Sequence, residues 1–258
     1  MFESLQTARD KAAYEKKFLA NRDENLFMGS FENFEQAREN VPASHASGYD
    51  NAAGAKTMYS HQIYNWDYPA LFWIGDSVHR GMRSVFDLGG HVGIKYYAFG
   101  RVVDFPPELR WTVCDVPGVA QTGKELAAER GAGQKLRFCT DWREADGTDV
   151  LLISGALQYL PTTLGQILAG LARKPRRVIL NTTAMHAERT IFTHNSIGIG
   201  ICPYRIQKQD EIQNDLVQAG YRRKDSWINE GKPIQVPFVE GGDAPYYGGM
   251  CFDLKLAD

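Results

Sequence analysis

Short apolar runs alternate with helical patterns from residue 83 onward, and this alternation restricts the fold more than any other feature. Such an alternation is typical of βαβ units, in which helices connect parallel strands and cover both faces of the sheet. We expect strands near residues 83–88, 110–114, 136–139, 149–154, 176–181, 222–228 and 248–254, and helices near 92–100, 117–130, 162–173 and 208–219. No helical pattern separates the last two strands, so they should pair antiparallel at one edge. The prediction is an α/β, doubly wound, mostly parallel sheet of seven strands.

The first 80 residues lack this alternation. Residues 7–20, 30–40 and 50–63 have helical patterns, and residues 64–73 (YNWDYPALFW) are rich in aromatic side chains. We therefore expect residues 1–80 to form an N-terminal helical cap or lid, and residues 81–258 to form the main domain. An aromatic lid would close over a ligand, whereas the simpler interpretation is a helical cap that covers the open edge of the sheet.

Composition excludes several classes of protein. The net charge is −2, from 29 basic and 31 acidic residues, and no basic run predicts nucleic-acid binding. The charged N-terminus has no apolar core of a signal peptide, and no apolar run reaches the roughly 18 residues that span a bilayer. The four cysteines are far apart and form no C-x-x-C pair, which predicts buried free thiols and no metal site. We expect a cytoplasmic protein without membrane insertion.

The loop after the first expected strand carries the strongest ligand signal. In VFDLGGHVGIKYYAF, residues 85–99, Asp87 precedes Gly89, Gly90, His91 and Gly93. Glycines at such a turn let a ligand approach the backbone, and the next helix offers free N–H groups. The dinucleotide fingerprint G-x-G-x-x-G does not fit, because His91 stands where its second glycine would be. An acidic residue followed by G-x-G-x-G fits except at His91.

Charge favours S-adenosylmethionine (SAM) as the ligand of this turn. SAM carries an ammonium and a sulfonium group, which Asp87 would attract, whereas Asp87 would repel the pyrophosphate of a dinucleotide. The competing interpretation is a tight turn that only packs the helix on the strand. The pattern thus predicts a class I methyltransferase version of the Rossmann-like sheet.

Polar residues follow the next three strands, where a nucleoside and an acceptor would lie. Asp115 could accept hydrogen bonds from the ribose hydroxyls with Val116 beside it, or it could cap the next helix. Thr140, Asp141 and Trp142 could hold the adenine, or form an ordinary turn. Ser154 and Gly155 should face the zone of methyl transfer. Gln158 and Tyr159 are candidates on the acceptor side, although Tyr159 could simply be a packed aromatic residue.

Several of these motifs occur together in one family. The chain resembles class I SAM-dependent methyltransferases associated with bacterial polysaccharide biosynthesis loci. The resemblance rests on FMGSFENFEQA, GYD, YPALFW, FDLGGHVGIKYY, WTVCDVPGV, SGALQYLP, FTHNSIGIGICPYRI, GYRRKDSW and YYGGMCF. The resemblance implies SAM as the cofactor. It also implies that a histidine at the position of His91, in GGHVG, is typical of the family. A similar turn occurs in O-methyltransferases, which commonly place a catalytic histidine just after the fourth strand, where this chain has Gln158.

The resemblance leaves the general base open. His194, expected on a loop after the fifth strand, is the main candidate, and His61 is a second one. Arg205 could face an anionic acceptor or pair with Asp210. The hypothesis is O-methylation of a small acceptor, such as a sugar or nucleotide sugar, in polysaccharide or secondary-metabolite biosynthesis, by a chain that could form homo-oligomers. Two alternatives stay open: a SAM-binding partner of glycan enzymes that transfers no methyl group, and a nicotinamide-dependent oxidoreductase.

Overall fold

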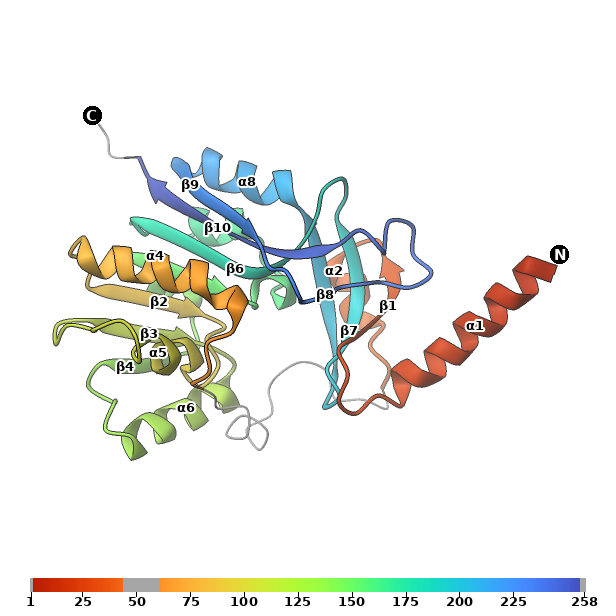
Figure 1. Ribbon diagram of the computed structural model, residues 1–258, viewed down its shortest axis with the longest axis horizontal. Coiled ribbons are helices and arrows are strands. Elements are labelled where there is room, and N and C mark those ends of the chain that lie inside the picture. The colour runs from red at the N-terminus through yellow and green to blue at the C-terminus, as the bar shows by residue number, and fades with distance from the viewer. Residues whose placement is uncertain (1, 44–60, 256–258) are drawn as a thin grey trace. The chain divides into compact units, whose positions relative to one another are not determined.

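The computed structural model describes residues 2–43 and 61–255 and is drawn in Figure 1. Contacts divide the chain into two compact units, each assembled from separate segments. Of the described residues, 61–183, 210–232 and 247–255 form what we call the sheet unit, and 2–43, 184–209 and 233–246 form the hairpin unit. The expected division of the chain at residue 80 stays a prediction.

The sheet unit has the expected doubly wound arrangement. Its strand order is β4-β3-β2-β5-β6-β10-β9, in which β4 to β6 run parallel and β9 pairs antiparallel with β10. The strands are β2 (Ser84–Leu88), β3 (Arg110–Cys114), β4 (Leu136–Cys139), β5 (Val150–Ser154), β6 (Arg177–His186), β9 (Tyr221–Ile228) and β10 (Tyr246–Leu254). Their bounds lie close to the expected ones, except that β6 continues to His186 instead of ending near residue 181. β5 and β6 are buried along almost their whole length, as expected for central parallel strands covered on both faces.

Helices and short 3₁₀ turns connect these strands. They are η1 (Asn65–Asp67), α4 (Tyr68–His79), α5 (Ile94–Phe99), α6 (Pro117–Glu129), η2 (Trp142–Ala145), η3 (Leu157–Tyr159), α7 (Leu164–Ala169) and α8 (Gln209–Gln218). One buried cluster joins Ile74 of α4 and Phe99 of α5 to Trp111 of β3. Aromatic and branched side chains of this size supply most of the free energy of burial.

The hairpin unit was not expected from the sequence. It contains α1 (Phe2–Leu19), β1 (Leu26–Phe31), α2 (Phe34–Glu39), β7 (Ile191–Ser196) and β8 (Ile201–Lys208). β7 pairs antiparallel with β1 and β8, and the last residues of β6 pair with β8. In the described residues, hydrogen bonds therefore join ten strands, and the prediction of seven strands was wrong.

The N-terminal segment is also not wholly helical. Residue Ser30, expected at the start of a helix over residues 30–40, lies in β1, because its neighbours pair with β7 across the sheet. The helix begins only at Phe34, where the side chain of Asn33 accepts a hydrogen bond from the N–H of Gln36 at 2.8 Å. Of the helix expected at residues 50–63, residues 50–60 lie outside the described part, and residues 61–63 are not helical.

A capping box at the start of α7 gives a first prediction. The hydroxyl of Thr163 accepts from the N–H of Gln166 at 3.2 Å, and the Gln166 side chain accepts from the Thr163 N–H at 2.8 Å. We expect Thr163→Ala to lower the free energy of unfolding by about 1 kcal/mol. Chemical denaturation measures this, and Thr163→Ser, which keeps the hydroxyl, should lose much less. Equal losses in the two variants would contradict the capping role.

Two sequence predictions concern cysteines and membranes. All four cysteines are buried and carry free thiols, as expected. Among the described helices, none combines the length and apolar character that a bilayer span requires.

Candidate functional site

A cavity of about 420 Å³ opens within the sheet unit at the carboxyl ends of β2, β5 and β6. In open α/β sheets, ligands bind outside these strand ends. The glycine turn contributes one part of the lining, the end of β5 another, and three further segments the rest. The lining residues are Tyr64, Trp66, Asp87, Gly89, Gly90, His91, Ile94, Lys95, Ser154, Gly155, Thr182 and Lys232.

At Gly89 and Gly90 the turn after β2 has no room for a side chain. Gly89 has φ +74°, and a Cβ built on it would lie 2.2 Å from the Cβ of Ala156. A Cβ on Gly90 would lie 2.4 Å from the carboxyl group of Asp87. Contacts this short are forbidden between real atoms, so both positions require glycine. The backbone thus comes close to the buried carboxylate and forms one wall of the cavity.

His91 occupies the middle glycine position in a left-handed conformation. It adopts φ +56°, the left-handed conformation that a glycine would supply at lower cost. Its N–H donates to Oδ2 of Asp115 at 2.9 Å, which connects the turn to the end of β3. Burial lowers the pKa of His91, and its buried Nδ1 has no hydrogen-bond partner among the described residues.

Asp115 is half-buried and already accepts two backbone hydrogen bonds. One comes from His91 and the other from the N–H of Val116 at 2.8 Å, directly before α6. Asp115 therefore helps to shape the turn.

Asp87 is the most perturbed acid of the site. It is fully buried, and its Oδ2 accepts from Nε1 of Trp111 at 3.1 Å. Its Oδ1 has no hydrogen-bond partner among the described residues. Burial raises the pKa of Asp87 to about 7, although the Trp111 hydrogen bond and the charge of Lys95 oppose the shift. A cation beside Oδ1 would favour the ionised form.

Lys95 was missed by the sequence analysis, although it lies two residues after the last glycine of the turn. Its Nζ contacts Oδ1 of Asp67 at 2.6 Å, and the Asp67 side chain is fully buried. Asp67 also accepts from the N–H of Tyr64 at 3.2 Å. This ion pair ties the segment around η1 to the glycine turn, and it neutralises Lys95.

The expected aromatic segment contributes two rings to the cavity. Tyr64 and Trp66 stack with ring centroids 4.8 Å apart and 6° between their planes. Two aromatic residues of the 64–73 segment therefore form part of the cavity wall. Closure as a lid stays a prediction.

The expected residues after β5 separate into two groups. Ser154 and Gly155 line the cavity, whereas Gln158 is buried beside it. The amide of Gln158 donates to the carbonyl of Thr182 at 3.2 Å. Tyr159, in η3, is half-buried and is not among the lining residues.

Thr182 is another residue that the sequence did not reveal. It lines the cavity with φ +49°, which is unfavourable for a β-branched residue and often marks a functional position. Its hydroxyl accepts from the amide of Asn229 at 3.2 Å, so the segment after β9 lies beside the end of β6.

The expected adenine residues form an ordinary turn in this structure. Oδ1 of Asp141 accepts from the N–H of Arg143 at 2.9 Å and caps η2. The ring of Trp142 lies against Gly170, and the Arg143 guanidinium lies 4.8 Å from the ring centroid. Thr140 is exposed. Adenine binding by these residues stays a prediction.

His194 lies inside a strand and not on the expected loop. It belongs to β7 of the hairpin unit and is buried, and burial lowers its pKa while a hydrogen bond from its ring opposes the shift. That bond joins Nε2 to the carbonyl of Ala37 at 2.7 Å, and the ring packs 4.4 Å from Phe31. Arg205 is buried in β8 of the same unit. This placement weighs against His194 as a base, a role that stays untested.

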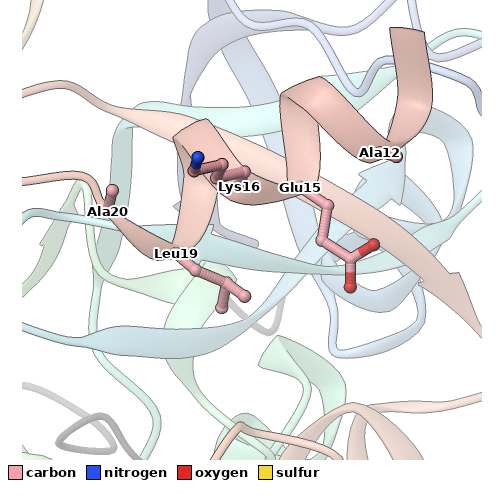
Figure 2. Close-up of a pocket in the computed structure, with 5 residues that line it drawn as sticks. All are labelled: Ala12, Glu15, Lys16, Leu19 and Ala20. Atoms are coloured by element: carbon pink, nitrogen blue, oxygen red, sulfur yellow. The ribbon is translucent and has the colours of Figure 1, made fainter. Parts of the chain in front are cut away.

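Two other observations add no second site. A pocket of about 480 Å³ along α1 is lined by Ala12, Glu15, Lys16, Leu19 and Ala20. Figure 2 shows these five side chains. All five residues come from one helix and its end, so no groups converge on a ligand. No cluster of three or more His, Cys, Asp or Glu side chains that could hold a metal occurs in residues 2–43 and 61–255.

Comparison with known proteins identifies the fold. No protein-family model matches the chain, and no curated protein matches its sequence. The structure is similar to a SAM-dependent methyltransferase from Clostridium acetobutylicum, with a TM-score of 0.51, 9% identity, and coverage of 75% of this chain and 93% of that one. It is also similar to the N-terminal domain of EvdMO1 with SAH bound, with a TM-score of 0.51, 13% identity, and coverage of 75% and 82%.

Some similar proteins are longer. The chain covers 57% of an O-methyltransferase family protein from Burkholderia thailandensis, with a TM-score of 0.49, 15% identity and 74% of this chain matched. It covers 54% of mitomycin 7-O-methyltransferase MmcR. At these identities the two likenesses with a TM-score of 0.51 show the fold alone, which is that of class I methyltransferases.

Proposed function

We propose that this chain is a SAM-dependent methyltransferase that methylates a small polar acceptor. The observation that carries the proposal is the glycine turn, which lies against a fully buried acid with one unpaired oxygen and lines a cavity. The class I methyltransferase fold supports it, because this turn occupies the ligand position of such sheets.

The residues of the cavity fit SAM better than a dinucleotide. The unpaired Oδ1 of Asp87 offers a partner for an ammonium group, and it would repel a pyrophosphate. Asp115, at the end of the neighbouring strand β3, is bonded to the glycine turn through the N–H of His91, and we assign it to the ribose hydroxyls. When bound, SAM supplies an electrophilic methyl group.

The chain's own residues would position the reactants and exclude water. Gly89 and Gly90 allow the ligand to contact the backbone. The aromatic side chains of Tyr64 and Trp66 line another part of the cavity. Aromatic faces also stabilise cations. Methyl transfer is an in-line displacement, so alignment of the acceptor and exclusion of water contribute much of the catalysis.

Asp115→Ala tests the cofactor site. The change removes the proposed ribose acceptor and the hydrogen bond that holds the turn, so we expect S-adenosylhomocysteine (SAH) to bind at least about tenfold more weakly by calorimetry. Asp141→Ala is the matched control for the adenine assignment. The same titrations with NAD should show no binding. An unchanged affinity for SAH in Asp115→Ala would refute the ribose role.

For the acceptor, we propose a hydroxyl group of a sugar or related metabolite, in polysaccharide or secondary-metabolite biosynthesis. The resemblance in sequence motifs supports this choice. Incubation with labelled SAM and a panel of sugars and nucleotide sugars tests it. Label on a nitrogen or carbon atom of an acceptor would overturn it.

One observation favours a second function, in which the chain binds SAM without transferring methyl groups and assists glycan enzymes. None of the three predicted catalytic side chains, Gln158, Tyr159 and His194, lines the described cavity. Tight binding of SAH without labelling of any acceptor in the panel would favour this alternative.

A further inference from the structure

One lysine of the cavity has no hydrogen bond or ion pair to a described residue. Lys232 lines the cavity, and its Nζ lies 4.7 Å from the centroid of the Tyr247 ring. No hydrogen bond or ion pair of this ammonium group occurs among the described residues. By contrast, the other lysine of the cavity, Lys95, is paired with Asp67 at 2.6 Å. A half-buried ammonium without an anion is costly, so an anionic ligand would stabilise it.

Lys232 reaches the cavity from a different part of the sheet than the proposed cofactor residues. Asp87 lies in β2 and Asp115 follows β3, whereas Lys232 follows β9, on the other side of β2 in the strand order. Two contacts fix this segment: Asn229 donates to Thr182 of β6 at 3.2 Å, and a Cβ on Gly231 would lie 3.8 Å from the Asn65 amide. Lys232 thus belongs to the end of the cavity that β6 and η1 build.

We propose that Lys232 binds an anionic group, a carboxylate or phosphate, of the methyl acceptor. The proposal rests on the proposed function, and it makes the acceptor an acid. The stacked rings of Tyr64 and Trp66, which line the same cavity, provide a flat apolar surface for the rest of such a molecule. Burial and the nearby Lys95 lower the pKa of Lys232, Asp67 opposes this, and a bound anion would oppose it further.

Anion titrations of the full chain saturated with SAH test this assignment. The probes are acetate, inorganic phosphate and the neutral acetamide, followed by calorimetry up to 100 mM. We expect acetate or phosphate to bind the wild type at least about tenfold more tightly than Lys232→Met, as expected for loss of a charge-assisted hydrogen bond. Lys232→Arg should retain most of the affinity, and acetamide should not bind. The stronger of the two anions indicates whether the acceptor is a carboxylate or a phosphate.

Each other outcome overturns a specific claim. Equal anion binding by wild type and Lys232→Met, or no anion binding by the wild type, refutes the acceptor role of Lys232. A loss of SAH affinity in Lys232→Met assigns the lysine to the cofactor and also refutes it. Failure of the wild type to bind SAH refutes the proposed function instead, and the anion titrations of the free protein then still test Lys232.

Discussion

Gly89→Ala should destabilise the protein by roughly 3 kcal/mol and abolish measurable binding of SAH. The left-handed conformation at φ +74° costs an alanine about 1–2 kcal/mol. In addition, the new Cβ would lie 2.2 Å from the Cβ of Ala156, which cannot rotate away because it is attached to the backbone. The backbone must shift to relieve this contact, and such overpacking costs about 1–3 kcal/mol. The shift would also move the wall of the cavity.

Gly131→Ala is the matched control. Gly131 has φ +66°, but no atom lies within 4 Å of a Cβ built on it. In Gly131→Ala, only the cost of the left-handed conformation should lower the free energy of unfolding, by about 1 kcal/mol. This variant should bind SAH like the wild type. Denaturant titration gives the two free energies of unfolding, and calorimetry gives the affinities. Similar losses in both variants would mean that the turn adjusts without strain, and that its close packing does not define the site.

The elements of the sheet unit could be predicted because their sequence signals are local. Each buried parallel strand is a short apolar run, as in residues 150–154, and each following helix has its own pattern. The glycine turn was also predictable, since its spacing relative to Asp87 reflects backbone geometry within a few residues. The ends of these strands therefore agree with the structure to within a few residues, except for the longer β6.

The hairpin unit could not be predicted, because its pairing joins distant segments. β1 pairs with β7, so that Phe27 lies opposite Asn195, and neither strand has the apolar alternation of an amphipathic strand. Asn195 and His194 are polar but buried, because they find hydrogen-bond partners such as Leu26 and Ala37. A sequence pattern cannot show such partners, so this segment was interpreted as a loop.

The same limit applies to the site. Lys95 and Lys232 are surface-type residues in sequence, and only the folded chain places both in one cavity with Asp67 beside Lys95. The strained conformation of Thr182 leaves no sequence signal at all, because glycine or asparagine would be expected there. Conversely, Asp141 and Trp142 have the residue types of a binding site, yet local hydrogen bonds account for their positions.

Asp87→Asn should stabilise the ligand-free protein at alkaline pH while it weakens binding of SAH. In the folded state Asp87 retains its proton up to about pH 7, whereas the unfolded chain releases it near 3.8. Between these values the folded state binds more protons, so the free energy of unfolding falls as the pH rises. The fall is about 1.4 kcal/mol per pH unit, or roughly 4 kcal/mol over the whole window. An amide carries no charge and does not incur this loss.

The measurement is the free energy of unfolding of wild type and Asp87→Asn at several pH values from 4 to 8, without ligand. From pH 4 to pH 8, the free energy of unfolding of Asp87→Asn should rise by roughly 4 kcal/mol relative to that of the wild type. Binding should change in the opposite direction. The variant offers no negative charge to an ammonium group, so its affinity for SAH at pH 8 should fall at least about tenfold. Wild-type affinity should also decrease as the pH falls below 7.

Asp149→Asn serves as a control with the opposite sign. Burial raises the pKa of Asp149, but hydrogen bonds from the N–H of Arg83 and from Ser84 outweigh this and lower it. Its contribution to stability is therefore present above the ordinary pKa and lost as the pH falls through the lower folded value. Asp149→Asn should lower the free energy of unfolding by about 2 kcal/mol at neutral pH, and this loss should become smaller at acidic pH. If wild type and Asp87→Asn instead gave parallel pH curves, Asp87 would be ionised throughout in the free protein, and its unpaired oxygen would already have a partner other than the proposed ligand.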